Sequence, residues 1–489
     1  MPIFKSHQPA IEIPTHLTTW DWLFDSAYSP LSRGLPSDQL AGYTDATTSE
    51  TVDWAAVKTL TTNLSTALVR KLSLRQGETV SLFSQNSVWY PIAMHGALRA
   101  GARVSGASPA YGVDEMAYAL RTAKTRVMIS HQNVIAQCLQ VQQITTADHD
   151  KVLAVLPAFH ITGLVHVLHL PVLINAAVII LPSFTMRSML ATIQKYRIRE
   201  LLLVPPILIR LIRDPVVAEY DLSCVRRFSS GAAPLSAEIL QLLRERFPGT
   251  GFKQGYGMTE SCSCITAHPP DRYDFRHAHT VGAIVASAEV RIVRPDGTDV
   301  AGVGESGEIL ARGPQVVMGY LDNPAATRET FDADGWLHTG DQGSIDADGL
   351  ITITDRIKEM IKVKGVAVAP AELEDLLLGH AKVEDVAVLG VADEYAGEVP
   401  KAYVVLKPGV VGGGGKGGDE TAAAAVAVGR ELLAYVRENK VRDKRVREVE
   451  FVEEIPKSAS GKILRRVLRD RAEKGVVVRD DAVADRAKL

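Results

Sequence analysis

Five short segments of the chain combine small residues with side chains that can bind a polar ligand. They are SSGAAPL (229–235), GYGMTE (255–260), HTGD (338–341), DRIKEMIKVKG (355–365) and PKSASGK (456–462). Small residues let a flat ring approach the backbone, and the Asp341 carboxylate can accept two hydrogen bonds from vicinal hydroxyl groups. Each segment alone is typical of a plain turn. Their occurrence together, in this order, predicts a binding site.

Other familiar sequence patterns are either absent or have a simpler interpretation. Gly302-x-Gly304-x-x-Gly307 matches the dinucleotide-binding fingerprint, but the strand-like EILARG follows it where that fingerprint requires a helix. We therefore interpret this segment as a hairpin turn. The sequence contains no G-x-x-x-x-G-K-[ST], no H-E-x-x-H and no G-x-S-x-G.

The composition narrows the class of protein. A chain of 489 residues is long enough for two or more domains with a large core. The formal net charge of −3, from 54 basic and 57 acidic residues, argues against a general nucleic-acid or anionic-membrane binder. Four cysteines are too few for a disulfide framework, and Cys262-x-Cys264 lacks the partners of a zinc site. We expect a protein of a reducing compartment.

Residues 153–182 contain no Asp, Glu, Lys or Arg, which raises the question of a membrane span. Pro157 and Pro171 interrupt this stretch, and three histidines and an asparagine lie within it. A spanning helix needs about 20 consecutive, mostly apolar residues. We therefore expect a buried βα segment and no transmembrane segment.

Alternation of short apolar runs with amphipathic stretches predicts an α/β fold. TVSLF (79–83), AAVIIL (176–181) and ELLLVPP (200–206) read as strands, and residues 87–101 and SMLATIQKYR as helices. This rhythm, from about residue 78 to residue 361, is typical of βα units with mainly parallel sheets. After Gly282 the pattern changes to strand, glycine-rich turn and strand, which predicts a small antiparallel β piece.

A domain boundary is expected at residue 355, where a β-rich region meets DRIKEMIKVKG. Residues 1–354 would form a large N-terminal domain of several subdomains, and residues 355–489 a small, mobile α+β domain with a hinge near 355–359. Within the second domain, VVGGGGKGGDETAAAAVAVG (410–429) has low complexity and is expected to form a flexible surface loop before a helix.

The order of these segments resembles that of the acyl-activating, adenylate-forming enzymes, most closely the 4-coumarate:CoA ligase-like branch of plant and fungal acyl-CoA ligases. The resemblance extends from TWDWLF, near residue 20, to the Lys462 turn. It implies an AMP-forming acid–thiol ligase that joins a carboxylic acid to ATP as an acyl-adenylate and then transfers the acyl group to coenzyme A. It also implies Mg²⁺ and a role in fungal secondary, fatty-acid or aromatic-acid metabolism.

The resemblance assigns roles to individual residues. Gly231, Ala232 and Ala233 are similar to the wall that packs on adenine and borders the acyl pocket, and Tyr256 and Gly257 to further adenine contacts. Thr259 resembles the residue that contacts the α-phosphate, and Glu260 the carboxylate near Mg²⁺. Asp341 and Arg356 resemble the ribose-binding pair, and Lys364 and Gly365 the residues that contact coenzyme A.

The remaining assignments concern the reacting carboxylate and the acyl group. Lys462 is similar to the lysine that bridges the substrate carboxylate and the phosphate, and Lys362 is a further candidate catalytic residue. His160, in LPAFHITG, resembles the gate of the acyl pocket, which residues 204–207 and Gln254 are expected to line. A lysine between two reacting anions lowers the barrier, and removing such a donor typically costs about 3–4 kcal/mol.

Two positions depart from the family pattern. The phosphate loop, a Ser/Thr/Gly-rich run ending in Pro-Lys-Gly, is missing: YALRTAKTR (118–126) continues directly into VMISHQN (127–133). Several dozen residues, including a strand, are expected between these segments. Either the chain is a mis-spliced or truncated version of a complete enzyme, or it has lost adenylation. In addition, Ala367 occupies a position where relatives often carry an amide side chain.

Three functions remain open: the ligase, a non-catalytic acyl-adenylate or CoA-thioester binder, and a luciferase-like oxygenase on the same scaffold. The last three residues, Ala487-Lys488-Leu489, are close to the Ser-Lys-Leu peroxisomal signal. We therefore expect a peroxisomal protein that binds an import receptor, with a cytoplasmic location as the alternative.

Overall fold

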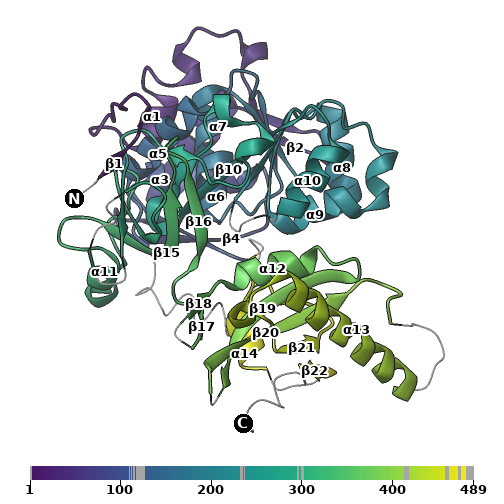
Figure 1. The fold of residues 1–489 in the computed structure, drawn as a ribbon. Helices are drawn as coiled ribbons and strands as arrows, with labels where there is room; N and C mark the ends of the chain where they lie inside the picture. Colours follow the sequence, from purple (N-terminus) through teal and green to yellow (C-terminus); the bar gives the residue numbers. More distant parts are fainter. Residues whose placement is uncertain are drawn as a thin grey trace. The chain divides into compact units, whose positions relative to one another are not determined.

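The computed structural model describes residues 3–109, 111, 113, 116, 127–231, 235, 237–294, 297–298, 302–364, 366–393, 395–411, 418–457, 462–471 and 475–480. They group into two compact units (Figure 1). Unit 1 comprises Met1–Ala232, Arg244–Thr339 and Ile345–Thr352, and unit 2 comprises Ala233–Leu243, Gly340–Ser344 and Ile353–Leu489. The long segment of unit 2 thus begins at Ile353, and two short earlier segments group with it.

The sheet that carries GYGMTE has the order β12-β11-β10-β9-β8. Its strands are β8 Glu200–Leu203, β9 Arg227–Ser230, β10 Gly251–Met258, β11 Ser263–Ala267 and β12 Ala283–Ile284. The first three are parallel, and β11 and β12 are added antiparallel. The crossovers that parallel pairing requires contain α9 Pro205–Arg213 and α10 Ala237–Arg246.

A second sheet of unit 1 has the order β3-β2-β7-β6, with β3 Thr51–Asp53, β2 Gly42–Asp45, β7 Ala177–Ile180 and β6 Lys151–Ala154. The fully buried rings of Tyr43 and Trp54 form an edge-on pair in its core. The surrounding helices are α1 Thr19–Phe24, α2 Trp54–Leu72, α3 Trp89–Arg99, α5 His131–Gln143 and α8 Met186–Tyr196. The expected strand at 79–83 is β4 Thr79–Phe83, which pairs in parallel with β5 Arg103–Ala107.

The region around β4 exposes several large apolar side chains. Phe83, Trp89 and Val113 are 50%, 54% and 88% exposed. Strand β4 contains no buried residue, and among the described residues β4 pairs with β5 in a sheet of two strands. Two paired strands are marginally stable in water without further packing. Phe83 and Trp89 precede β5 in the sequence and Val113 follows it, so all three come shortly before residues 126–127, where the sequence analysis expects a missing segment.

The antiparallel piece expected after Gly282 is a five-stranded sheet with the order β1-β13-β14-β15-β16. Its strands are β1 Phe4–Lys5, β13 Glu289–Val293, β14 Gly307–Arg312, β15 Leu337–Ile345 and β16 Ile351–Arg356, with α11 Pro324–Thr330 between β14 and β15. Strand β14 begins at Gly307 and pairs antiparallel with β13. The hairpin interpretation of Gly302-x-Gly304-x-x-Gly307 is therefore confirmed.

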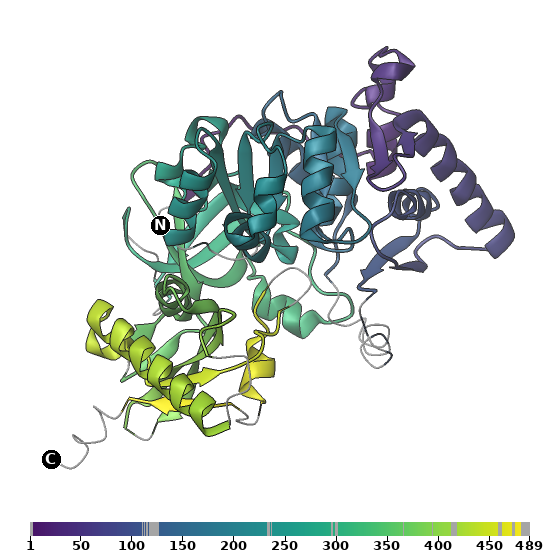
Figure 2. The ribbon, with the colours of Figure 1, turned by 90° about the vertical axis from the view of Figure 1, so that its right-hand side faces the viewer.

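Unit 2 contains the small α+β fold that the sequence indicates. Its strands are β17 Ile361–Val363, β18 Val366–Val368, β19 Val383–Asp393, β20 Gly397–Leu406, β21 Glu448–Phe451 and β22 Val477–Arg479. Helix α12 Pro370–Leu378 packs on β19, and α13 Gly418–Asn439 packs on β21 and β22 (Figure 2). The short helix α14 Arg465–Arg469 follows the Lys462 segment.

Two expectations about local structure need correction. Residues 410–429 were expected to form a loop, but α13 already begins at Gly418, because the alanine-rich run has a high helix propensity. GYGMTE and HTGD are not simple turns, since residues 255–258 belong to β10 and residues 338–341 to β15. Their strand neighbours, and not their own composition, determine this conformation.

The charge-poor residues 153–182 form no long helix. They comprise the end of β6, the short helix α6 Ile161–Gly163, the π-helix Leu164–His169, α7 Leu170–Ile174 and strand β7. Across the described ranges, no helix combines the length and the apolar character needed to cross a bilayer.

Candidate active site

In unit 1, the small-residue segments meet at the carboxyl ends of β9 and β10. Ser230 pairs in register with Gln254, so Gly231 and Gly255 follow side by side. A Cβ atom on Gly257 would lie 1.6 Å from the Ser263 carbonyl oxygen, so the close approach of β11 requires glycine here. A register shift at Tyr256 and Gly257 marks the same point. Ala232 and Ala233 lie outside the described residues.

Glu260 lies in the 3₁₀ turn Thr259–Ser261 directly after β10, with Thr259 as the first residue of that turn. Tyr320 donates a hydrogen bond of 2.7 Å to the Glu260 carboxylate, and the Val317 amide donates to the Glu260 carbonyl. Burial, followed by the bond to Glu260, raises the pKa of Tyr320 to about 12, so its hydroxyl group remains a donor at neutral pH. The sequence analysis missed Tyr320, which is 60 residues away in the chain.

The backbone after Glu260 adopts an uncommon conformation. Cys262 and Ser263 have φ angles of 49° and 106°. Positive φ costs energy for residues with a Cβ atom, and such residues often occur where a turn positions functional groups. Here the two residues reverse the chain from the Thr259–Ser261 turn into β11, which brings Ser263 against Gly257.

The residues expected at the acyl pocket lie on several elements of unit 1. His160 precedes α6, and its Nδ1 atom accepts a hydrogen bond of 3.3 Å from the Thr162 amide, which assigns the proton of the neutral ring to Nε2. Val204 precedes α9, whose first residues are Pro205 and Pro206. Gln254 is buried and donates to the carbonyl groups of residues 278 and 280, so it supports that loop.

In unit 2, Asp341 and Arg356 form the ion pair that the sequence predicts to bind two hydroxyl groups. The Arg356 Nε atom lies 3.5 Å from Asp341 Oδ1. The Ile357 amide donates to the Gly340 carbonyl, which holds the two strands together beside this pair. Asp355, next in sequence to Arg356, accepts hydrogen bonds from the amides of Arg356 and Ala371, so the expected hinge turn is tied to the start of α12.

The candidate lysines of unit 2 lie on three segments. Lys362 is exposed on β17, where it pairs with Ala367 of β18. Lys364 has a φ angle of 50°, and its ammonium group lies 4.3 Å from the centre of the Tyr395 ring. Lys462 is half-buried and precedes Ile463, which forms an isolated β-bridge with Lys457. Gly365 lies outside the described residues.

A further cationic residue of unit 2, Arg465, was missed. Its guanidinium group bonds to Glu374 at 2.6 Å and to Glu359 at 3.0 Å. It thereby joins the start of α14 to α12 and to the turn after Arg356. Burial raises the pKa of Glu374 to about 7, although the Arg465 charge and the Val388 amide oppose that shift. The start of α14, three residues after Lys462, is therefore linked through one side chain to the turn where the hinge is expected.

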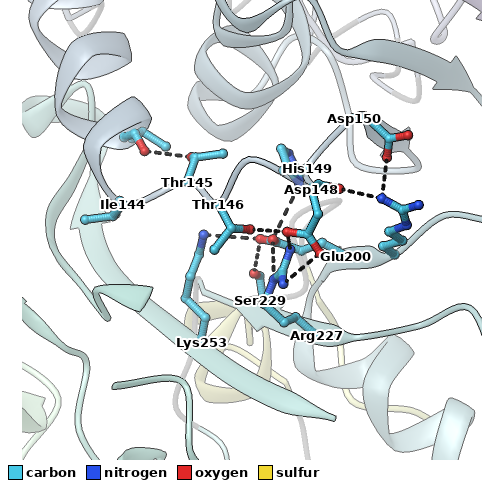
Figure 3. Close-up of polar contacts among 12 residues, drawn as sticks. Ile144, Thr145, Thr146, Asp148, His149, Asp150, Glu200, Arg227, Ser229 and Lys253 are labelled. Atoms are coloured by element: carbon cyan, nitrogen blue, oxygen red, sulfur yellow. Dashed lines mark hydrogen bonds and ion pairs between the residues drawn. The ribbon is translucent and has the colours of Figure 1, made fainter. Parts of the chain in front are cut away.

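Unit 1 contains a buried group of charges, also missed by the sequence analysis (Figure 3). One oxygen of Glu200 accepts a 2.8 Å hydrogen bond from Ser229 and lies 3.1 Å from Lys253 Nζ. The other lies 3.0 Å from Arg227 Nε and 3.4 Å from His149 Nδ1. Arg227 also bonds to Asp148 at 2.8 Å. The only sequence feature that could have indicated this group is Glu200 at the start of the apolar strand β8.

The electrostatics of this group keep its acid and base ionised. Burial would raise the pKa of Glu200, but Lys253 and His149 outweigh it and hold that pKa well below its ordinary value. Burial likewise favours a low pKa for Lys253, whereas Glu200 raises it. Both side chains are therefore charged at pH 7. The group thus contains the carboxylates of Glu200 and Asp148 and the cations of Arg227 and Lys253, with His149 beside them.

The donor set also accommodates a divalent cation. Mg²⁺ in phosphate-binding sites is held by one or two carboxylates together with substrate oxygens and water. Glu260 supplies one carboxylate, oriented by Tyr320, and Thr259 next to it supplies a hydroxyl group. No group of three or more His, Cys, Asp or Glu residues that could enclose a metal occurs in the described part of the chain. The residues thus fit a cation that is shared with a phosphate ligand.

Comparison with protein families identifies both units. The model of the AMP-binding enzyme family matches residues 36–129 and 126–321, and that of the AMP-binding enzyme C-terminal domain matches residues 372–462. The first match is divided into two pieces at residues 126–129, the position where the sequence analysis finds a segment missing. The candidate residues of β9, β10 and the Thr259–Ser261 turn lie within the second piece.

Curated relatives include several plant 4-coumarate:CoA ligases. The ligase of Petroselinum crispum is 32% identical, with 97% of each chain aligned, and that of Petunia hybrida is 40% identical over 72% of this chain. The alignment with the Petroselinum protein extends over 555 positions, more than the 489 residues present here. The chain spans 63% of the Petunia ligase and 59% of one from Oryza sativa.

Solved structures share the fold. ATP-bound MatB from Rhodopseudomonas palustris has a TM-score of 0.80 at 22% identity, covering 93% of this chain and 98% of its own. The o-succinylbenzoate CoA synthetase of Bacillus subtilis, bound to its acyl-adenylate, has a TM-score of 0.76, covering 94% and 99%. Both have the α/β architecture expected from the sequence. Together with the family matches and the Petroselinum alignment, this likeness establishes that the chain belongs to the AMP-binding, acyl-activating enzyme family, in which it is similar to the 4-coumarate:CoA ligases.

Proposed function

We propose that the chain is an AMP-forming acid–CoA ligase that acts on a carboxylic acid of fatty or aromatic metabolism. The observation that carries the proposal is the ion pair of Asp341 with Arg356 in a member of the AMP-binding family. A strand carboxylate next to a guanidinium group is suited to bind the two hydroxyl groups of a ribose. Gly231 and Gly255, at the ends of β9 and β10, carry no side chain that would keep an adenine ring away from the backbone.

In the first half-reaction, a carboxylate oxygen of the acid attacks the α-phosphorus of ATP, and the bond to pyrophosphate breaks. The reactants are both anionic, so cationic and hydrogen-bonding groups must offset their repulsion. Lys462 would contact the carboxylate and the α-phosphate, and Thr259 would donate to a phosphate oxygen. Glu260, held by Tyr320, would hold Mg²⁺. When bound, Mg²⁺ supplies charge neutralisation to the phosphates.

In the second half-reaction, the coenzyme A thiol loses its proton, and its sulfur atom attacks the acyl carbon. The bond to AMP then breaks, which leaves a thioester. Lys364 and Gly365 would bind coenzyme A, and Lys362 would stabilise the phosphate of the leaving AMP. The turn after Arg356 would allow unit 2 to adopt a different arrangement for each half-reaction.

The missing segment bears on the first half-reaction. Its loop would hold the β- and γ-phosphates, which matter only while pyrophosphate leaves. The divided family match and the exposed Phe83, Trp89 and Val113 support the interpretation that part of a larger subdomain is missing at this point. If the chain is a mis-spliced or truncated version of a complete enzyme, the divided family match and the exposed apolar side chains are both explained. We propose that this form of the chain is deficient in adenylation and retains the second half-reaction.

The same observation supports a second candidate function. A chain with the Asp341–Arg356 pair but without the phosphate loop could bind acyl-adenylates or CoA thioesters without turning them over. This protein would still recognise AMP. We further propose that the Ala-Lys-Leu terminus directs the protein to peroxisomes through the import receptor.

The experiment that separates the two candidates supplies a pre-formed acyl-adenylate, such as benzoyl-AMP, together with coenzyme A, and measures the thioester by mass spectrometry. The ligase proposal predicts enzyme-dependent benzoyl-CoA, with an Arg356→Ala variant markedly slower. Binding of AMP without any thioester above the uncatalysed rate would instead support the binding protein.

A further inference from the structure

The two faces of the sheet β8–β11 have different chemical characters. Strand pairing places Glu200 beside Arg227 and Ser229 beside Lys253, so these four side chains share one face. Because side chains alternate along a strand, Gly231 and Gly255 lie on the same face. The other face carries fully buried apolar residues, Leu201, Leu203, Phe228 and Phe252. The face that carries Glu200, Arg227 and Lys253 therefore combines charged side chains with glycines, which is unusual for a buried face of a sheet.

The glycines and the charges occupy different ends of that face. Gly231 and Gly255 follow the carboxyl ends of the parallel strands, where AMP is proposed to bind. Lys253 lies two residues before Gly255 on β10, and Ser229 lies two residues before Gly231 on β9. A strand advances about 3.3 Å per residue, so the charged end begins about 7 Å from the glycines. An acyl group that extends along the bare glycines would reach Lys253 after this distance.

Polar but uncharged groups border the interval between the glycines and Lys253. The Cys264 sulfur lies 3.6 Å from the position that a Cβ atom on Gly255 would occupy. His166, in the π-helix, has its Nε2 atom 3.4 Å from the Ser263 hydroxyl group. Burial and the neighbouring Lys253 lower the pKa of His166 to about 3, so its ring is neutral at pH 7. π-Helical turns occur frequently at functional sites.

The charged end cannot easily be displaced by an apolar chain. The two oxygens of Glu200 are in contact with Ser229, Lys253, Arg227 and His149, and Arg227 is also paired with Asp148 (Figure 3). Lys253 also lies 5.6 Å from the centre of the Tyr273 ring. Separating one partner from a buried ion pair leaves an uncompensated charge, which is strongly unfavourable. A long alkyl chain that extends beyond Lys253 would have to separate the Lys253–Glu200 ion pair.

We propose that the Lys253–Glu200 ion pair is the inner end of the acyl-binding face and restricts the ligase to acids with a compact acyl group. This inference rests on the proposed function. A bound acyl group no longer than benzoyl or hexanoyl would not extend as far as Lys253. A dodecanoyl group would extend beyond it and press its apolar end against the ion pair. Lys253 and Glu200 thus determine specificity for acyl length, and neither contacts the reacting atoms.

The test measures binding, which does not require the missing phosphate loop. Calorimetry on the full chain would compare AMP with N-acylsulfamoyl-adenosines that carry a benzoyl, hexanoyl or dodecanoyl group on the sulfamoyl nitrogen and cannot be hydrolysed to AMP. We expect the wild type to bind the benzoyl and hexanoyl compounds at least 100-fold more tightly than the dodecanoyl compound. The double substitution Glu200→Ala with Lys253→Ala removes both charges and their volume, and should reduce that ratio at least tenfold while AMP affinity changes by less than twofold.

Two further variants separate length from charge and guard against misfolding. Glu200→Leu with Lys253→Met keeps the volume but has no ion pair to separate, so its preference for the benzoyl over the dodecanoyl compound should fall below that of the wild type. Lys253→Arg keeps the ion pair and should resemble the wild type. Equal wild-type affinity for the dodecanoyl and benzoyl compounds would overturn the proposal without any variant. An unchanged ratio in a double-alanine protein that binds AMP normally would do the same. Failure of the wild type to bind AMP would instead overturn the proposed function, and this inference with it.

Discussion

Asp341 and Arg356 form an ion pair whose partners differ in exposure. Their Nε–Oδ1 distance is 3.5 Å, yet the Asp341 side chain is 7% exposed and the Arg356 side chain 50% exposed. Asp341 lies within β15, whereas Arg356 is the last residue of β16, before the turn at residues 357–359. The carboxylate is therefore buried within a strand, and the guanidinium group reaches it from the surface, where Glu359 also lies 3.9 Å from Arg356 Nη1.

The first prediction tests the ribose assignment. Asp341→Ala should weaken AMP binding by about 1.5–3 kcal/mol, the range for hydrogen bonds to a charged group. Isothermal calorimetry would measure it, with Asp348→Ala, an exposed carboxylate in the turn after β15, as the matched control. Identical AMP affinities for Asp341→Ala and the wild type would contradict the assignment.

The second prediction concerns the missing segment. The chain should show little carboxylate-dependent ATP–pyrophosphate exchange, because lost positioning and charge neutralisation together cost several kcal/mol, or about three decades in rate. Insertion of the corresponding Petroselinum segment between Arg126 and Val127 should restore exchange and cover the apolar residues near β4. Dye binding to exposed apolar surface would report the second effect. Robust exchange by the 489-residue chain would show that another segment replaces the loop.

The third prediction concerns the support of Glu260. Tyr320→Phe removes the 2.7 Å hydrogen bond to the carboxylate and should cost about 1–2 kcal/mol of folding stability. Thermal unfolding would measure this loss. Tyr28→Phe, at an exposed tyrosine, is the control and should change little. If both variants melt at the same temperature, the bond contributes nothing to stability.

The fourth prediction concerns pH. Burial lowers the pKa of His268 to about 4, while its Nδ1 atom accepts a hydrogen bond from the Gln254 amide. As pH falls below about 6.5, the unfolded chain takes up a proton at this position before the folded chain does. The stability from His268 is present above pH 6.5 and is lost toward pH 4, by about 2 kcal/mol between pH 7 and 5.

His268→Gln should therefore lose less stability than the wild type over that pH interval, even if it is less stable at pH 7. Calorimetric unfolding at pH 7 and pH 5 gives the two slopes. His7→Gln, at an exposed histidine, should keep the wild-type slope. Parallel slopes for His268→Gln and the wild type would contradict the prediction.

The fifth prediction concerns location. A fluorescent protein carrying the last dozen residues should collect in peroxisomes, and deletion of Lys488 and Leu489 should return it to the cytosol. Microscopy with a peroxisomal marker measures both. Diffuse fluorescence from the intact tail would remove the peroxisomal proposal.

The sequence by itself determined the family, the α/β class and most of the regular elements. Strand β4, helix α8 and strand β8 were predicted because residues two or four positions apart carry the apolar pattern of each element. The pairing of Asp341 with Arg356 was also foreseen, since both belong to local segments in a recognisable order, whereas the need for glycine at position 257 comes from the approach of Ser263 in the structure. The roles of charged residues in such segments can be inferred from the sequence without knowing which residues pack against them.

Only the tertiary structure brought together residues that are distant in the chain. Glu200, Arg227 and Lys253 come from three strands, and Asp148 from a loop before them, so their contact depends on the parallel register of β8, β9 and β10. Tyr320 reaches Glu260 for a similar reason, across 60 residues. Periodicity within one segment shows which of its side chains share a face, but it does not show which distant strands become its neighbours. The packing of the whole sheet decides that.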